Sequence, residues 1–62
     1  MKTFHHTAHD GTVEYLALDG RILTKEEALA NPLPDDVDLD LIRQRFESRY
    51  DAFLKSGTIT EL

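Results

Sequence analysis

Apolar and polar residues alternate along the first third of the chain, and the alternation is interrupted by Asp-Gly at 10–11 and again at 19–20. An Asp-Gly pair between two alternating segments is the strongest short-range signal for a β-hairpin. The pattern therefore predicts a three-stranded antiparallel meander, with strands at about 3–9, 12–18 and 21–23.

The two turns also predict which side chains share a face of this sheet. If each Asp-Gly pair is the centre of a two-residue turn, His9 lies opposite Thr12 and Leu18 lies opposite Arg21, which sets the register. The core face would then carry Phe4, His6, Ala8, Val13, Tyr15, Ala17 and Ile22, with His6 as its only strongly polar member. The opposite face is polar except for three leucines grouped at one end: Leu16, Leu18 and Leu23.

A short helix is predicted after the third strand. Thr24-Lys25-Glu26-Glu27 is a capping box, in which the first and last side chains satisfy each other's backbone amides. The helix should span 25–30, because Pro32 disfavours helical geometry in the residue before it. Asn31-Pro32-Leu33-Pro34 is then an extended connector.

A longer amphipathic helix is predicted over 36–55, with Asp35 or Asp36 as its N-cap. At 100° per residue its apolar positions fall within one narrow arc. These positions are Leu39, Ile42, Phe46, Tyr50, Phe53 and Leu54. The helix should end near Ser56-Gly57, where glycine suits the C-terminal cap. The tail 57–62 would either fray or add a strand.

These elements predict one small α+β domain over residues 1–62: a meander, a short helix and a longer helix packed on one face of the sheet. A chain of 62 residues builds only a thin core. It has no cysteine, which excludes disulfides and thiolate chemistry, so good local structure or oligomerisation is expected to add stability.

The formal net charge of -5 repels phosphate backbones and anionic membranes, and so favours neutral or basic partners. No apolar run approaches the roughly 20 residues of a membrane span, and the first residues lack the apolar centre of a signal peptide. We therefore expect a cytoplasmic protein with no membrane association and with nucleic acid an improbable partner.

Three histidines near the start invite a metal-site interpretation, with Glu14 as a fourth ligand. On a strand, however, His5 and His6 point to opposite faces, and His5 lies about 13 Å from His9 at 3.3 Å per residue. We predict no metal and no cofactor. No nucleophile and base, phosphate loop or other catalytic motif is present, which favours a protein that is not an enzyme.

An acidic run precedes the long helix, with carboxylates at Asp35, Asp36, Asp38 and Asp40. It lacks the glycine and glutamate that a calcium loop requires at positions six and twelve. One interpretation is that the acids cap the helix and interact with its dipole. The other is that they dock a basic partner, or imitate the phosphates of DNA.

Three arginines, Arg43, Arg45 and Arg49, give the middle of the long helix a basic character. A sheet element followed by two helices is weakly similar to ribbon-helix-helix DNA binders, which carry basic residues on a single short strand. Here Lys2 is the only early cation, and we expect the arginines to be solvated residues that cover apolar surface.

The leftover apolar surface points to a partner chain. Leu16, Leu18 and Leu23 face away from the predicted core, and the first strand is an unprotected edge of the meander. We therefore predict a homodimer, with these leucines and the four aspartates as candidate protein interfaces. The expected function is a non-enzymatic interaction module that regulates or inhibits another protein. The alternative is a nucleic-acid-linked regulator: an antitoxin-like subunit, a DNA mimic or a small DNA binder.

Overall fold

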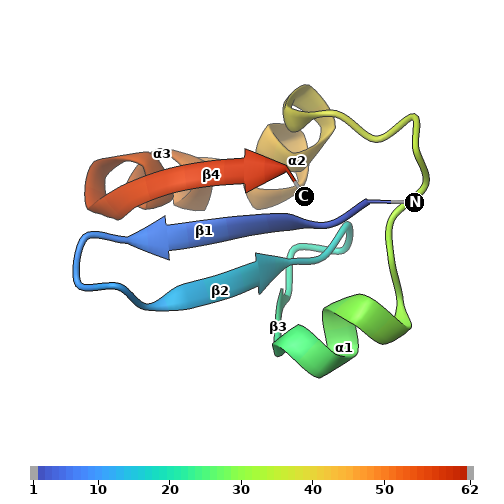
Figure 1. Cartoon of the computed structure of the whole chain (residues 1–62). Helices are drawn as coiled ribbons and strands as arrows, with labels where there is room; N and C mark the ends of the chain where they lie inside the picture. Colours follow the sequence, from blue (N-terminus) through green and yellow to red (C-terminus); the bar gives the residue numbers. More distant parts are fainter. Residues whose placement is uncertain (1, 62) are drawn as a thin grey trace.

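Within residues 2–61, which the computed structural model describes, the chain folds into one antiparallel sheet of four strands with three helices packed on it. The elements are β1 (Phe4–Ala8), β2 (Val13–Leu16), β3 (Ile22–Leu23), α1 (Lys25–Ala30), α2 (Leu39–Phe46), α3 (Ser48–Ser56) and β4 (Gly57–Glu61). The strand order is β3-β2-β1-β4 (Figure 1). The α+β class is as predicted, but the sheet has a fourth strand.

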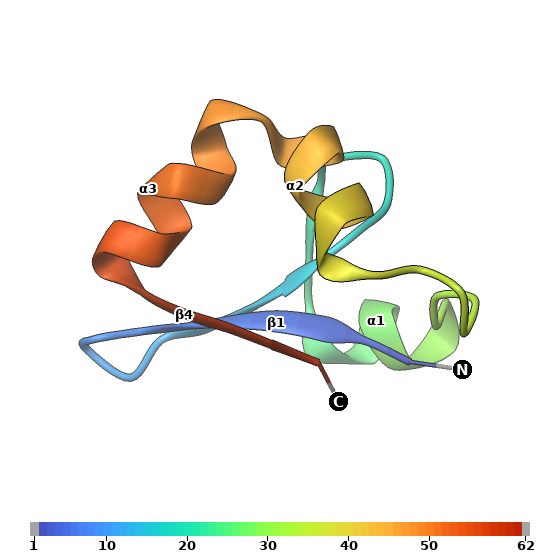
Figure 2. The same cartoon turned by 90° about the horizontal axis from the view of Figure 1, so that it is seen from above.

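The helices pack on two different parts of the sheet. Helices α2 and α3 cover one face, and α1 packs against β2 and β3 at one end (Figure 2). The core lies under α2 and α3, where apolar side chains from both layers are almost fully buried. Its members are Phe4, Leu16, Val37, Ile42, Phe46 and Tyr50. Among residues 2–61 no helix is long and apolar enough to cross a membrane.

Both hairpin turns are one residue longer than predicted. The amide of Gly11 donates to the carbonyl of Ala8 at 3.0 Å, and the amide of Ala8 donates to the carbonyl of Thr12 at 2.8 Å. Three residues, 9–11, thus separate the last pair of the two strands. The Asp10 carboxylate accepts from the Thr12 amide at 2.9 Å, a local bond that favours a turn with only Gly11 at positive φ. The second turn repeats this arrangement with Asp19 and Gly20.

The longer turns shift β2 by one residue relative to the predicted register. Phe4 pairs with Leu16, and Leu16 pairs with Ile22. The prediction was therefore right for β1, whose Phe4 and His6 are buried beneath the helices. It was wrong for β2, because Leu16 faces the core while Val13 is 47% exposed on the other face. A one-residue slip exchanges the two faces of a strand.

The predicted long helix is two helices joined at Glu47. This residue has φ 56°, which interrupts the helical backbone between α2 and α3. The break changes the angle of the chain, and the predicted apolar stripe is buried only in its middle: Leu39 and Leu54, at its two ends, are exposed. The predicted N-caps were also wrong, because Asp38 caps α2 by accepting from the Leu41 amide at 3.0 Å.

The C-terminal tail forms β4, which pairs with β1 along its whole length. Strand β1 is therefore a central strand, and the prediction that it is a free edge was wrong. Gly57 passes so close to Thr7 and Ala8 that any side chain there would collide with their backbone. A glycine at this position lets the chain turn directly from α3 into the sheet.

Candidate functional site

A cleft of about 350 Å³ lies between α1, the β2–β3 hairpin and the connector that follows α1. This volume lies at the lower end of the range of small-molecule and peptide pockets. Its apolar lining comes from Leu16, Ala17, Leu18, Leu23, Ala28 and Leu33, and its polar lining from Thr3, Asp19, Arg21, Glu27 and Asn31. The site therefore has an apolar floor and a polar rim.

The cleft exists because α1 is short and its one buried side chain is small. The capping box begins α1, with the Glu27 amide donating to Thr24 Oγ1 at 3.1 Å and the Thr24 amide donating to Glu27 Oε1 at 3.0 Å. The helix has six residues, or about 9 Å at 1.5 Å per residue, and buries only Ala28. So short a helix with a methyl group as its only buried side chain leaves the neighbouring sheet surface partly open.

The rim of the cleft is charged. The Arg21 Nε donates to Asp19 Oδ2 at 2.7 Å, and this bond, with the Arg21 amide, holds the pKa of Asp19 below its usual value. The capping bonds from Thr24 likewise lower the pKa of Glu27. Both carboxylates are ionised at neutral pH, and Arg21 is matched by Asp19, so the rim is acidic on balance.

Two of the most exposed apolar side chains belong to the elements that form the cleft. Leu29 of α1 is 62% exposed, and Ile22 of β3 is 40% exposed. Apolar surface on this end of the molecule thus extends beyond the floor of the cleft.

The three leucines predicted as an interface are brought together, but they are not one exposed patch. Leu16 is 3% exposed and belongs to the core, so its assignment to the outer surface was wrong. Leu18 is half-buried and packs against the core, and Leu23 is half-buried. All three line the cleft.

The predicted acidic interface lies elsewhere. Asp35, Asp36, Asp38 and Asp40 are exposed around the start of α2, and none of them lines the cleft. Val37, in the middle of this run, is buried, and its carbonyl accepts from Lys2 Nζ at 2.8 Å. The segment is thus anchored to the N-terminal end of the sheet while its carboxylates face solvent.

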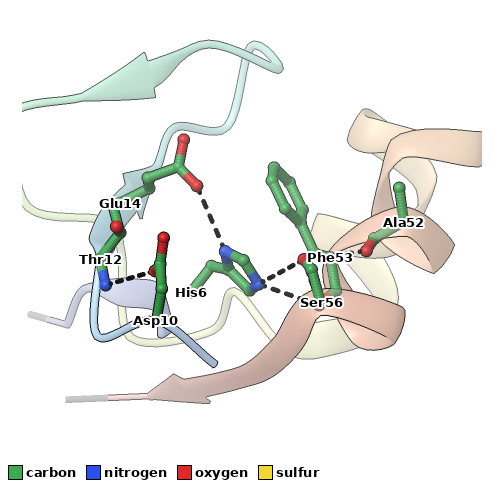
Figure 3. A network of polar contacts seen from close by, with 7 residues as sticks. All are labelled: His6, Asp10, Thr12, Glu14, Ala52, Phe53 and Ser56. Atoms are coloured by element: carbon green, nitrogen blue, oxygen red, sulfur yellow. Dashed lines mark hydrogen bonds and ion pairs between the residues drawn. The ribbon is translucent and has the colours of Figure 1, made fainter. Parts of the chain in front are cut away.

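His6 forms a buried polar network that joins β1 to β2 and to the end of α3 (Figure 3). The side chain is 2% exposed. Its Nε2 lies 2.9 Å from the Phe53 carbonyl oxygen and 3.3 Å from Ser56 Oγ, and its Nδ1 lies 3.3 Å from Glu14 Oε1. The ring also contacts the Phe53 ring, with centroids 4.7 Å apart. Only the placement of His6 on the core face followed from its sequence.

Ser56, His6 and Glu14 follow the order of a nucleophile, a base and a carboxylate in a catalytic triad. The closest neighbour of His6 Nε2 is nevertheless the Phe53 carbonyl, which can only accept a hydrogen bond. Ser56 Oγ donates toward the carbonyls of Ala52 and Phe53, and the negative end of the helix dipole there disfavours an oxyanion. The geometry therefore suits a tie between sheet and helix better than acyl transfer.

The three arginines of the second half have different environments. Arg49 donates to the carbonyl of Gly20 at 2.6 Å and lies over the Phe46 ring at 4.8 Å, so it fastens α3 to the β2–β3 turn. Arg43 contacts Asp40 at 3.4 Å, and Arg45 is exposed. They do not form one basic surface free for phosphate.

No cluster of three metal-ligating side chains occurs among the described residues. Comparison with known proteins found no matching family model, no matching curated protein and no matching solved structure.

Proposed function

We propose that the protein is a non-enzymatic interaction module that binds another protein through the α1 cleft. The observation that carries this proposal is the cleft itself, with its apolar floor, its acidic rim and the exposed Ile22 and Leu29 beside it. Apolar surface surrounded by polar groups is typical of protein interaction sites. The partner would insert an apolar side chain into the floor and place a basic group against Asp19 or Glu27.

The size of the chain supports a regulator or inhibitor rather than an enzyme. Four of the polar residues that line the cleft are paired with each other or with backbone: Asp19 with Arg21, Glu27 with the Thr24 amide, and Asn31 with the Glu27 carbonyl. None of them is a histidine or stands beside a second group able to exchange a proton with it. A rim of this kind provides recognition and orientation, which is what a binding module requires.

A second candidate is a nucleic-acid-linked regulator whose carboxylates dock a basic protein or imitate DNA phosphates. It is favoured by the exposed acidic segment at the start of α2, which presents carboxylates at 35, 36, 38 and 40. In this candidate the binding surface is the acidic segment and the cleft is dispensable.

Affinity capture from the source organism with matched variants separates these candidates. Leu23→Asp places a charge in the cleft, and Val13→Asp places the same charge on the same face of the sheet but outside the cleft. We expect the partner captured by the wild type to be retained by Val13→Asp and lost with Leu23→Asp. Circular dichroism melts of both variants check that each is folded.

A third variant, Asp36→Asn with Asp40→Asn, leaves the Asp38 cap intact while removing two of the exposed carboxylates. Loss of the partner with this variant, together with its retention by Leu23→Asp, would transfer the function to the acidic segment. Retention by all three variants would exclude both surfaces.

A further inference from the structure

The two edges of the sheet are built differently. The β3 edge has two residues and lies beside α1, and short or covered edges resist pairing with other chains. The β4 edge has five residues, Gly57–Glu61, all in continuous register with β1. It contains no proline, lysine or bulge, which are the usual devices against edge pairing. In Figure 1 it is the uppermost strand of the sheet.

The register identifies which backbone groups of β4 face outward. The Ala8 amide donates to Thr12, toward β2, whereas the His9 amide donates to Ser56, toward the β4 side. Hydrogen-bonded pairs alternate along antiparallel strands. Because His9 bonds to Ser56, the next hydrogen-bonded pairs are Thr7 with Thr58 and His5 with Thr60. Thr58 and Thr60 therefore direct their amides and carbonyls toward β1. The amides and carbonyls of Gly57, Ile59 and Glu61 therefore point to the open edge.

An exposed apolar side chain stands beside this edge. On α3, Arg49 reaches Gly20 and Ser56 reaches His6, so one flank of the helix faces β1 and the β2–β3 turn. At 100° per residue around the helix axis, Leu54 lies about 140° from Arg49 and about 160° from Ser56. It is therefore on the opposite flank of α3, which faces β4. It is 49% exposed. Ile59 pairs with His6 and so lies on the same helix-covered face of the sheet.

We propose that two copies of the chain pair through β4, antiparallel and with the two-fold axis at Ile59, to form one continuous eight-stranded sheet. Gly57 would then pair with Glu61 of the partner subunit, and Ile59 with the partner's Ile59, each donating and accepting one backbone bond. Thr58 would stand opposite the partner's Thr60 on the uncovered face of the sheet.

A second copy fits this edge because the strand is complementary to itself. Antiparallel pairing about Ile59 sets no two like charges opposite each other and creates two threonine pairs, a favourable cross-strand combination. Leu54 precedes β4 by three residues and is 49% exposed, so it adds apolar surface near the paired edges. The α1 clefts lie at the far edges of the joined sheet and remain open.

Sedimentation equilibrium of charge-patterned variants tests this register. In Thr58→Lys with Thr60→Lys, each lysine faces a lysine of the partner subunit, whereas in Thr58→Lys with Thr60→Glu each faces an opposite charge. Both positions are exposed. We expect a wild-type dimer at micromolar concentration. The dissociation constant of the Lys/Lys variant should be about tenfold or more larger than that of Lys/Glu, because the charge interaction in two symmetric cross-strand pairs changes from attraction to repulsion.

Circular dichroism melts establish that both variants are folded. A wild type that remains monomeric up to millimolar concentration would overturn the proposal, and so would Lys/Lys and Lys/Glu variants that dimerise equally. The result does not depend on the α1 cleft, because Leu23→Asp should change partner capture without changing the dimer.

Discussion

The side of the sheet under α2 and α3 and the β2–β3 end beside α1 differ in how thoroughly they are packed. On one face α2 and α3 bury Ile42, Phe46 and Tyr50 against Phe4 and Leu16. At the β2–β3 end, α1 contributes a single buried residue, Ala28, and leaves a cleft. The first layer supplies stability, and the second leaves apolar surface open to a partner.

The largest expected effect is on the packed side. Phe46→Ala should lower the free energy of unfolding by about 3–5 kcal/mol, because it opens a cavity in the core under α2 and α3 and removes the ring on which Arg49 and Phe53 pack. For a domain of this size that loss is comparable to the whole stability, at about 0.1 kcal/mol per residue. The matched control on the α1 side, Leu29→Ala, should change it by no more than about 0.5 kcal/mol.

Urea denaturation followed by circular dichroism measures both variants. A cooperative transition close to that of the wild type for Phe46→Ala would show that the α2–α3 layer does not dominate stability. A large loss for Leu29→Ala would show that the two layers contribute equally.

An intermediate effect is expected at the start of α1. Thr24→Ala removes the hydroxyl that accepts from the Glu27 amide and should cost about 1 kcal/mol. Because α1 forms one wall of the cleft, the same variant should also increase hydrogen exchange of the α1 amides. Thr24→Ser keeps the hydroxyl and is the control: if it is as destabilised as Thr24→Ala, the capping bond is not the cause.

The smallest effect is a pH dependence carried by the same cap. The pKa of Glu27 is held below its ordinary value of 4.5 in the folded chain by its bonds with Thr24. A carboxyl whose pKa is lower when folded binds fewer protons than in the unfolded chain, so its contribution is complete above 4.5 and is lost as pH falls through the folded pKa. Glu27→Gln should therefore show a shallower loss of stability on acidification than the wild type.

The control is Glu26→Gln, in the same first turn but outside the capping box. Both substitutions remove one negative charge, so thermal melts between neutral and acidic pH isolate the capping contribution. Equal acid profiles for the two variants would contradict the role assigned to Glu27.

Local signals in the sequence were sufficient to predict several elements. The Asp-Gly pairs predicted both hairpins, and the capping box predicted α1 with its observed bounds. Alternation placed Phe4 and His6 on the core face, as observed. These signals succeed because turns, caps and alternation depend on residues only a few positions apart.

The features that the sequence did not predict are those for which the local pattern is compatible with more than one structure. A turn of two residues and one of three both contain Asp-Gly, and the choice between them moved Leu16 into the core and Val13 out of it. The apolar stripe of 36–55 continues through Glu47 with no glycine or proline to mark a break, yet the chain bends there. The cleft could be anticipated only in part, because the sequence grouped Leu16, Leu18 and Leu23 as outer surface through a register that the structure corrects for Leu16.

The sequence by itself thus determined the class of the fold, the two hairpins, the first helix and the apolar side of the second half. Only the tertiary structure decided that β4 returns beside β1, that Arg49 fastens to Gly20 and that His6 meets Phe53 and Ser56. These contacts join residues 29 to 57 positions apart. They form because the sheet edge and the buried polar groups need partners that no neighbouring residue can provide.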